Sequence, residues 1–160
     1  MNHHKLFIKG DIESGWVRLI FSWSNEEFVI FSSYIFDGLA NLISAAITIN
    51  KGFDQSEASF FCEPEEFIFS FSKLDAETIE LTCFCRDKFK GDSILFSKPS
   101  DLKVVFRTST TIKRLTNQVL SLFDYFEKTY GHQGYEERWR RPFPAESLDK
   151  LRNIGKKKSV

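Results

Sequence analysis

The chain has 160 residues, of which 42% are hydrophobic and 18 are phenylalanine. This is enough apolar material for one sizeable core, and it argues against disorder. The 22 basic and 22 acidic side chains cancel, so no net field directs the chain to nucleic acid or to a membrane surface. No stretch approaches the roughly 20 apolar residues of a membrane span, and the N-terminus lacks the layout of a secretory signal. We therefore expect one soluble domain over residues 1–160, located in the cytosol.

The period-two alternation of residues 15–23 predicts a strand, and a second antiparallel strand follows a turn at Ser24-Asn25. Further along the chain, apolar and aromatic segments separated by turn residues predict more strands, at 58–62, 66–71, 79–85, 93–96 and 102–108. Strands that follow one another through short turns indicate an antiparallel sheet, here of five to seven strands.

Apolar spacings of three and four residues predict three helices, at about residues 34–50, 109–130 and 145–153. We expect Ser32 or Ser33 to cap the first helix and Ser109 or Thr110 to cap the second. Gly131 is expected to end the second helix. Strands grouped with strands, followed by helices, predict an α+β fold with the helices packed on one face of the sheet.

The end of the chain contains one aromatic and basic segment and one lysine-rich segment. Residues 132–134 are expected to form a polar loop, and residues 135–144 mix Tyr, Trp and Phe with arginines. Such a mixture can anchor the C-terminus on the core, contact a partner or line a nucleic-acid groove; we favour the anchor. Residues 155–160 are expected to be a flexible basic tail.

No catalytic motif is visible. The sequence has no glycine-rich phosphate loop, nucleophile elbow or His-Glu-x-x-His helix. His3 and His4 lie at the terminus, and His132 has no sequence-local acid or nucleophile that would identify it as a base. We therefore expect a protein that is not an enzyme and that needs no cofactor.

The three cysteines do not form a disulfide framework or a zinc motif. Cys83 and Cys85 share one face of a predicted strand, with Cys62 as a third thiol, but no second pair of ligands accompanies them. We interpret them as small apolar core residues rather than as a metal or redox site.

Charge is unevenly distributed along the chain. Residues 1–101 contain 9 basic and 16 acidic residues, a net of −7, and residues 102–160 contain 13 and 6, a net of +7. An acidic run that includes Glu63, Glu65 and Glu66 has two readings. It is either a solvated strand edge protected against aggregation or a surface complementary to a basic partner.

Three parts of the chain resemble small bacterial immunity-type proteins of contact-dependent growth-inhibition and polymorphic toxin systems. They are residues 34–42 (YIFDGLANL), the Cys62-Glu63-Pro64-Glu65-Glu66 corner, and the closing pattern Tyr135…Trp139…Pro142-Phe143-Pro144…Leu148…Leu151. The resemblance covers about residues 16 to 152. It carries no family active-site motif.

The resemblance implies a cytosolic antidote that binds and neutralises a cognate toxin domain by steric and electrostatic occlusion. Such toxins are frequently nucleases with positively charged clefts, which an acidic surface would cover. The residues expected to contribute to that surface are Glu63, Glu65, Glu66, Asp75 and Glu77. The alternative is a protein-interaction module with a non-toxin partner, or a nucleic-acid-binding protein, which zero net charge disfavours.

Overall fold

The computed structural model describes residues 5–158, and it confirms the α+β fold. The expectations placed on His3 and His4 lie outside the described residues. The elements in chain order are β1 (Phe7–Glu13), β2 (Trp16–Trp23), β3 (Glu26–Ser33), α1 (Gly38–Asn50), β4 (Gln55–Phe61), β5 (Glu66–Lys73), β6 (Thr78–Arg86), the 3₁₀ turns η1 (Ile94–Phe96) and η2 (Pro99–Asp101), β7 (Lys103–Thr111), α2 (Ile112–Trp139) and α3 (Ala145–Lys158).

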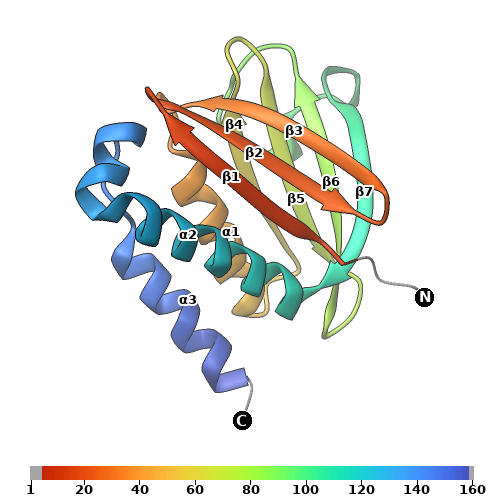
Figure 1. Ribbon diagram of the computed structural model, residues 1–160. Helices are drawn as coiled ribbons and strands as arrows, with labels where there is room; N and C mark the ends of the chain where they lie inside the picture. The colour runs from red at the N-terminus through yellow and green to blue at the C-terminus, as the bar shows by residue number, and fades with distance from the viewer. Residues whose placement is uncertain (1–4, 159–160) are drawn as a thin grey trace.

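The seven strands form two antiparallel sheets, β1-β2-β3 and β4-β5-β6-β7, and not the single sheet that the sequence predicts. Helix α1 separates β3 from β4 in the chain, and the second sheet lies behind the first (Figure 1). The apolar faces of the two sheets meet. The rings of Phe21 and Phe69 stack with centroids 4.3 Å apart, and those of Trp23 and Phe106 do the same. Each sheet therefore buries its apolar side chains against the other.

The helices close the side of the sandwich where β1 and β4 lie. Helix α1 packs on β4 and α3, while α2 runs beside β1 (Figure 1). Two α2 side chains bond to the outer edge of β1, where Gln118 Oε1 accepts from Ile8 N at 3.0 Å and Tyr130 Oη accepts from Ile12 N at 3.1 Å. A strand edge that would otherwise expose unpaired N–H groups is covered in this way.

One buried cluster joins both sheets to the helices. Helix α1 contributes Leu39, Leu42 and Ile43, and α2 contributes Phe123 and Phe126, all of which are fully buried. The wide apolar arc expected for the first helix is confirmed. It exists because α1 lies between strand β4 and the other two helices.

The structure corrects several predicted boundaries in the first two thirds of the chain. Strand β1 was not predicted, although its side chains alternate between exposed and buried around Gly10. Residues 94–96 form a 3₁₀ turn in place of a strand. The N-cap of α1 is Asp37, whose Oδ1 accepts from Ala40 N at 3.1 Å; Ser32 and Ser33 belong to β3.

Boundaries in the last third also differ from the predicted ones. Thr111 caps α2, one residue after Thr110, and its hydroxyl accepts from Arg114 N at 3.0 Å. Gly131 interrupts the helix with φ 70° as expected, but the expected loop at residues 132–134 is helical.

Helix α3 extends to Lys158, so residues 155–158 form its last turn and not a flexible tail. Residues 159 and 160 lie outside the described part. Within residues 5–158, no helix combines the length and the hydrophobicity needed to cross a membrane.

Candidate functional site

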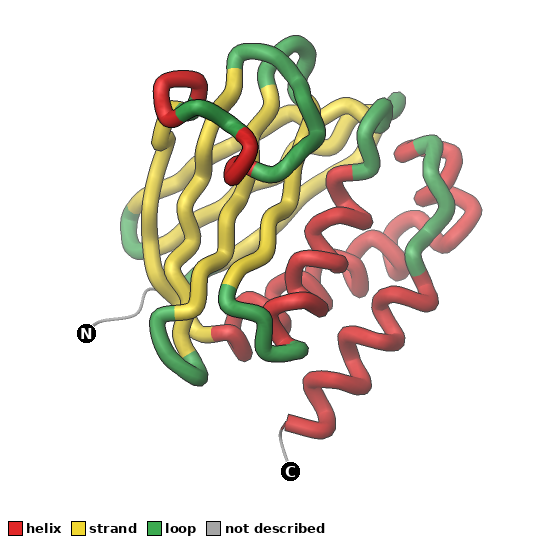
Figure 2. Tube along the Cα trace, turned by 180° about the vertical axis from the view of Figure 1, so that it is seen from behind, coloured by secondary structure: helices red, strands yellow, loops and turns green. Residues whose placement is uncertain are grey.

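The segment between β6 and β7, residues 87–102, is the longest connection between strands that contains no α-helix in the described structure. It crosses the outer face of the four-stranded sheet and contains the short turns η1 and η2 (Figure 2). We call it the β6–β7 loop. Connections of this length with little regular structure are usually functional or disordered. The contacts that hold this loop show which description applies.

A buried ion pair fixes the beginning of the loop. Arg86, at the end of β6, is 2% exposed, and its Nε and Nη2 both lie 2.9 Å from Oε1 of Glu66, which is 0% exposed. The same guanidinium donates to three loop atoms, namely Asp92 Oδ1 and Asp92 O at 2.7 Å and Ser97 Oγ at 2.8 Å. Because a guanidinium is planar and rigid, these contacts fix the positions of Asp92 and Ser97 relative to the end of β6.

Glu66 also receives hydrogen bonds from the loop backbone. Its Oε1 accepts from Lys90 N at 3.0 Å and from Gly91 N at 3.4 Å, while Oε2 is buried with no hydrogen-bond partner among the described residues. Burying a charged pair with one oxygen unsatisfied costs desolvation energy that an apolar pair of the same volume would avoid. The pair therefore contributes more to defining the loop conformation than to stability.

A second carboxylate and an aromatic ring hold the middle of the loop. Glu57 on β4 accepts from Ser93 Oγ at 2.6 Å and from Ile94 N at 2.9 Å. The ring of Phe89 packs on that of Phe61, with centroids 4.7 Å apart. The loop is therefore attached to the four-stranded sheet from Phe89 to Ile94, where turn η1 begins.

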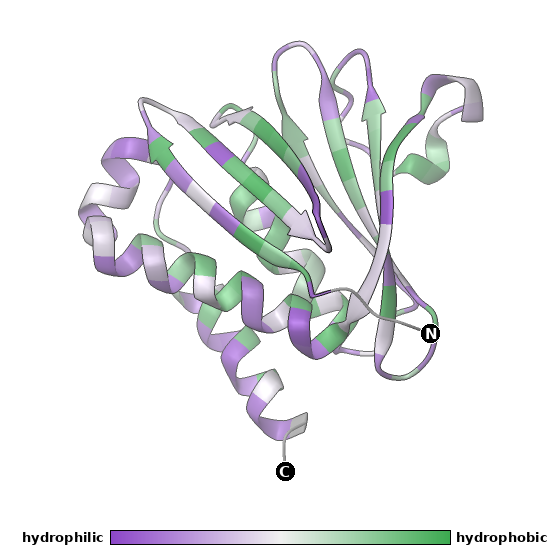
Figure 3. Cartoon of the chain, turned by 45° about the vertical axis from the view of Figure 1, so that its right-hand side comes forward, coloured by the Kyte–Doolittle hydropathy of each residue, from purple (hydrophilic) through white to green (hydrophobic). Residues whose placement is uncertain are grey.

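Turn η1 presents two large apolar side chains to solvent. Leu95 is 76% exposed and Phe96 is 82% exposed. The turn lies at the right-hand edge of the molecule in Figure 3, where the hydropathy colouring shows its apolar character. Val104 and Val105, at the start of β7, are also exposed. Bulky apolar groups held in a fixed conformation outside the core are typical of interaction sites.

The acidic surface predicted from the sequence does not exist as one patch. Glu66 is fully buried and paired with Arg86. It therefore cannot contact a partner. Glu63 and Glu65 are exposed at the β4–β5 corner, which adjoins the start of the β6–β7 loop. Asp87, the first residue of the loop, is exposed there as well.

Asp75 and Glu77 lie in the turn at the opposite ends of β5 and β6. The eight-residue strand β5 separates them from Glu65 by roughly 23 Å. Asp75 has a structural role in this turn, because its Oδ1 accepts from Glu77 N and Thr78 N at 2.9 Å. These two residues therefore do not extend the surface around Glu63.

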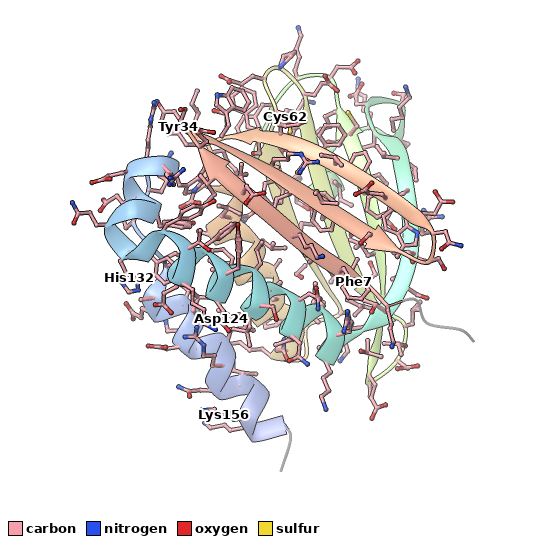
Figure 4. All side chains as sticks on the ribbon, in the orientation of Figure 1. Phe7, Tyr34, Cys62, Asp124, His132 and Lys156 are labelled. Carbon is pink, nitrogen blue, oxygen red and sulfur yellow. The ribbon has the colours of Figure 1, made fainter. Side chains whose placement is uncertain are left out.

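The three cysteines are free thiols, and the pKa of each is raised. Cys83 is buried, while Cys62 and Cys85 are half-buried near the β4–β5 corner (Cys62 is labelled in Figure 4). Burial, assisted by the nearby Glu65 carboxylate, raises the pKa of Cys62 to about 12. Burial also raises the pKa of Cys83 and of Cys85. Residues 5–158 contain no cluster of three or more His, Cys, Asp or Glu side chains that could hold a metal ion.

The aromatic and arginine-rich segment anchors the C-terminal part to the core, as the favoured interpretation predicts. Tyr135 and Trp139 are buried, and Trp139 Nε1 donates to Asp37 Oδ1 at 2.9 Å. Arg141 donates to the carbonyls of Tyr34 and Ile35 at 3.0 and 2.7 Å. Tyr135, Trp139 and Arg141 are thus engaged within the protein, while Arg138 and Arg140 of the same segment are exposed.

His132 is an exposed residue on the second part of α2 (Figure 4). Its Nε2 lies 2.6 Å from Glu127 Oε2, and its ring stacks on Phe143 with centroids 4.3 Å apart. This arrangement gives the histidine one carboxylate partner and an aromatic support.

Comparison with known proteins gives no match, whether to a protein-family model, to a curated protein or to a solved structure. The resemblance to immunity-type proteins therefore stays a prediction.

Proposed function

We propose that this protein acts as a binding protein without turnover, and that it neutralises a cognate toxin domain in the cytosol of the producing cell. The observation that carries the proposal is the β6–β7 loop. Its two most exposed apolar side chains, Leu95 and Phe96, lie between Asp92 and Ser97, which both bond to the buried Arg86. An inhibitor that must bind tightly benefits from such preorganisation, because little conformational entropy is lost when the complex forms.

The charge next to the loop is mixed. The carboxylates of Glu63, Glu65 and Asp87 are exposed where the loop leaves the sheet, and the loop itself carries the exposed Lys88, Lys90 and Lys98. In the proposed complex, Leu95 and Phe96 insert into an apolar depression of the toxin domain, and the three carboxylates face the positively charged rim of its cleft. Apolar anchors supply most of the affinity, while the charges accelerate association. The toxin is inactivated because its substrate can no longer enter.

The experiment uses the toxin domain that this proposal expects to be encoded beside the gene for this chain. We expect the wild-type protein to protect cells that express that domain, and we expect Leu95→Asp combined with Phe96→Asp to abolish protection. Leu74→Asp is the matched control, because Leu74 is also an exposed apolar residue but lies in the β5–β6 turn. Each anchor is expected to contribute about 2 kcal/mol to binding.

The possible outcomes separate the proposed function from its alternative. Protection by the wild type and the control, but not by the loop variant, supports the proposal. If the wild type does not protect, the immunity function is wrong. A non-toxic protein bound through Leu95 and Phe96 would then identify a different interaction module.

A further inference from the structure

A cavity lies at the end of the molecule away from the β4–β5 corner. It has a volume of about 790 Å³ and lies between the end of α1, the β5–β6 turn, the first turns of α2 and the last turns of α3. Small-molecule sites typically have volumes of about 300–1,000 Å³. Figure 4 places Lys156, which lines the cavity, and Cys62, at that corner, at opposite ends of the molecule.

The cavity wall contains a buried polar network. Asn50 and Thr116 are each about 95% buried. Asn50 Nδ2 donates to Ala46 O and to Thr116 Oγ1, both at 2.8 Å, and Thr116 Oγ1 donates to Ile112 O at 2.8 Å. Both amide hydrogens of Asn50 are therefore used. Its Oδ1 is the remaining polar atom of a side chain that lines the cavity.

Two lysines face the cavity from different helices. Lys113 lies on α2 and Lys156 on α3, and neither has a carboxylate within ion-pair distance in residues 5–158. Arg152 also lines the cavity, but it is paired with Asp124 at 2.9 Å and with Asp149 at 3.1 Å. Glu77 is the one carboxylate of the described lining, so the lining carries an excess of positive charge.

A glycine keeps the cavity open. Gly155 lies within α3, where glycine is less favourable than alanine by about 1 kcal/mol. A Cβ at this position would meet only Thr116 Cγ2, at 4.0 Å. The backbone would therefore accept a side chain here, and that side chain would fill the cavity.

We propose that this cavity binds a small organic anion that carries an apolar ring or chain. The acidic group lies between Lys113 and Lys156, the apolar body packs on Ile112 and Leu120, and a donor group bonds to Asn50 Oδ1. This inference does not depend on the proposed function, because it uses no residue of the β6–β7 loop.

The test is a fluorescence titration with 8-anilinonaphthalene-1-sulfonate, which joins a sulfonate to two aromatic rings. We expect saturable binding of one probe per chain, and binding weaker by at least about tenfold for Lys113→Glu combined with Lys156→Glu. Gly155→Phe is expected to remove binding while leaving the circular dichroism spectrum unchanged. The matched control is Lys88→Glu with Lys98→Glu, which reverses two exposed charges of the β6–β7 loop.

N-phenyl-1-naphthylamine, which has the same rings without the sulfonate, should bind at least about tenfold more weakly than the anionic probe. Equal affinity of the two probes would overturn the proposal, as would unchanged binding in the Lys113→Glu, Lys156→Glu variant or in Gly155→Phe. The proposal would also be overturned if the wild type bound no anionic probe at probe concentrations up to about 1 mM. If Gly155→Phe alters the fold, the lysine variant decides, because both lysines are surface residues.

Discussion

The β6–β7 loop and the C-terminal segment 135–143 both attach to the sandwich from outside the sheets, but their side chains are arranged in opposite ways. The C-terminal segment buries Tyr135 and Trp139, while Arg141 donates to carbonyls at the surface. The loop is held by buried charges and directs Leu95 and Phe96 outward. A segment that serves only the fold buries its apolar groups. The loop buries charged groups and exposes apolar ones, and folding alone does not explain this arrangement.

The largest expected effect is in the C-terminal segment. Trp139→Ala should lower the free energy of unfolding by about 4 kcal/mol, because it removes a fully buried indole and leaves a cavity. Chemical denaturation at neutral pH measures the change. Trp139→Phe is the control, since it keeps most of the packing and loses the hydrogen bond to Asp37; it should cost about 1–2 kcal/mol. Equal losses for the two variants would mean that packing is not the main contribution.

The next effect concerns the buried charges below the loop. Glu66→Ala leaves Arg86 buried without its main partner and should cost about 3 kcal/mol. Hydrogen exchange at the amides of Lys90 and Gly91 should accelerate more than exchange in β2, because these amides lose their acceptor.

Glu65→Ala, at the exposed neighbour, provides the control for this experiment and should change stability by less than about 0.5 kcal/mol. Unchanged protection of Lys90 and Gly91 in Glu66→Ala would show that the ion pair does not fix the loop.

A smaller effect should appear at alkaline pH. The pKa of Cys62 rises from 9.0 to about 12 on folding, so between these values the unfolded chain releases a proton that the folded protein retains. The free energy of unfolding should therefore be fully maintained below about pH 9 and should fall as the pH rises above it. Denaturation at several pH values, with Cys62→Ala as the comparison, measures this contribution. A Cys62→Ala variant with the same alkaline loss as the wild type would contradict the assignment.

The smallest expected effect on the free energy of unfolding comes from replacing the exposed apolar side chains of the loop. Leu95→Ser combined with Phe96→Ser should change the free energy of unfolding by less than about 0.5 kcal/mol, since neither side chain is in the core. Thermal denaturation measures it. A loss of more than about 2 kcal/mol would mean that these residues pack in solution and that the comparison with the C-terminal segment is wrong.

Local patterns predicted most of the secondary structure but not its assembly. The alternation in β2 and the three- and four-residue spacing in α2 depend on neighbouring residues, and both elements are present as predicted. The division into two sheets depends on contacts such as Phe21 with Phe69, which are distant in the chain. Strand β1 escaped prediction because Gly10 interrupts its apolar alternation. The backbone carbonyl of Arg18 lies so close that a Cβ at Gly10 would be 2.9 Å from it.

The candidate site could be predicted only in part. An acidic residue before an alternating strand is typical of a solvated position, so the sequence predicts Glu66 at the surface. Its pairing with Arg86, twenty residues later, follows from strand register, which places the two residues opposite each other. The sequence predicts a strand at residues 93–96, where the structure has the turn η1. The available signal was the frequency of Gly, Ser, Asp and Pro around it.

Affinity for the proposed toxin domain, in purified form, is the decisive measurement of whether Leu95 and Phe96 form the binding surface. Isothermal titration calorimetry with the wild type and the Leu95→Ser, Phe96→Ser variant gives the two dissociation constants. The account predicts that the variant, still folded, binds at least about 100-fold more weakly. A dissociation constant equal to that of the wild type would contradict it.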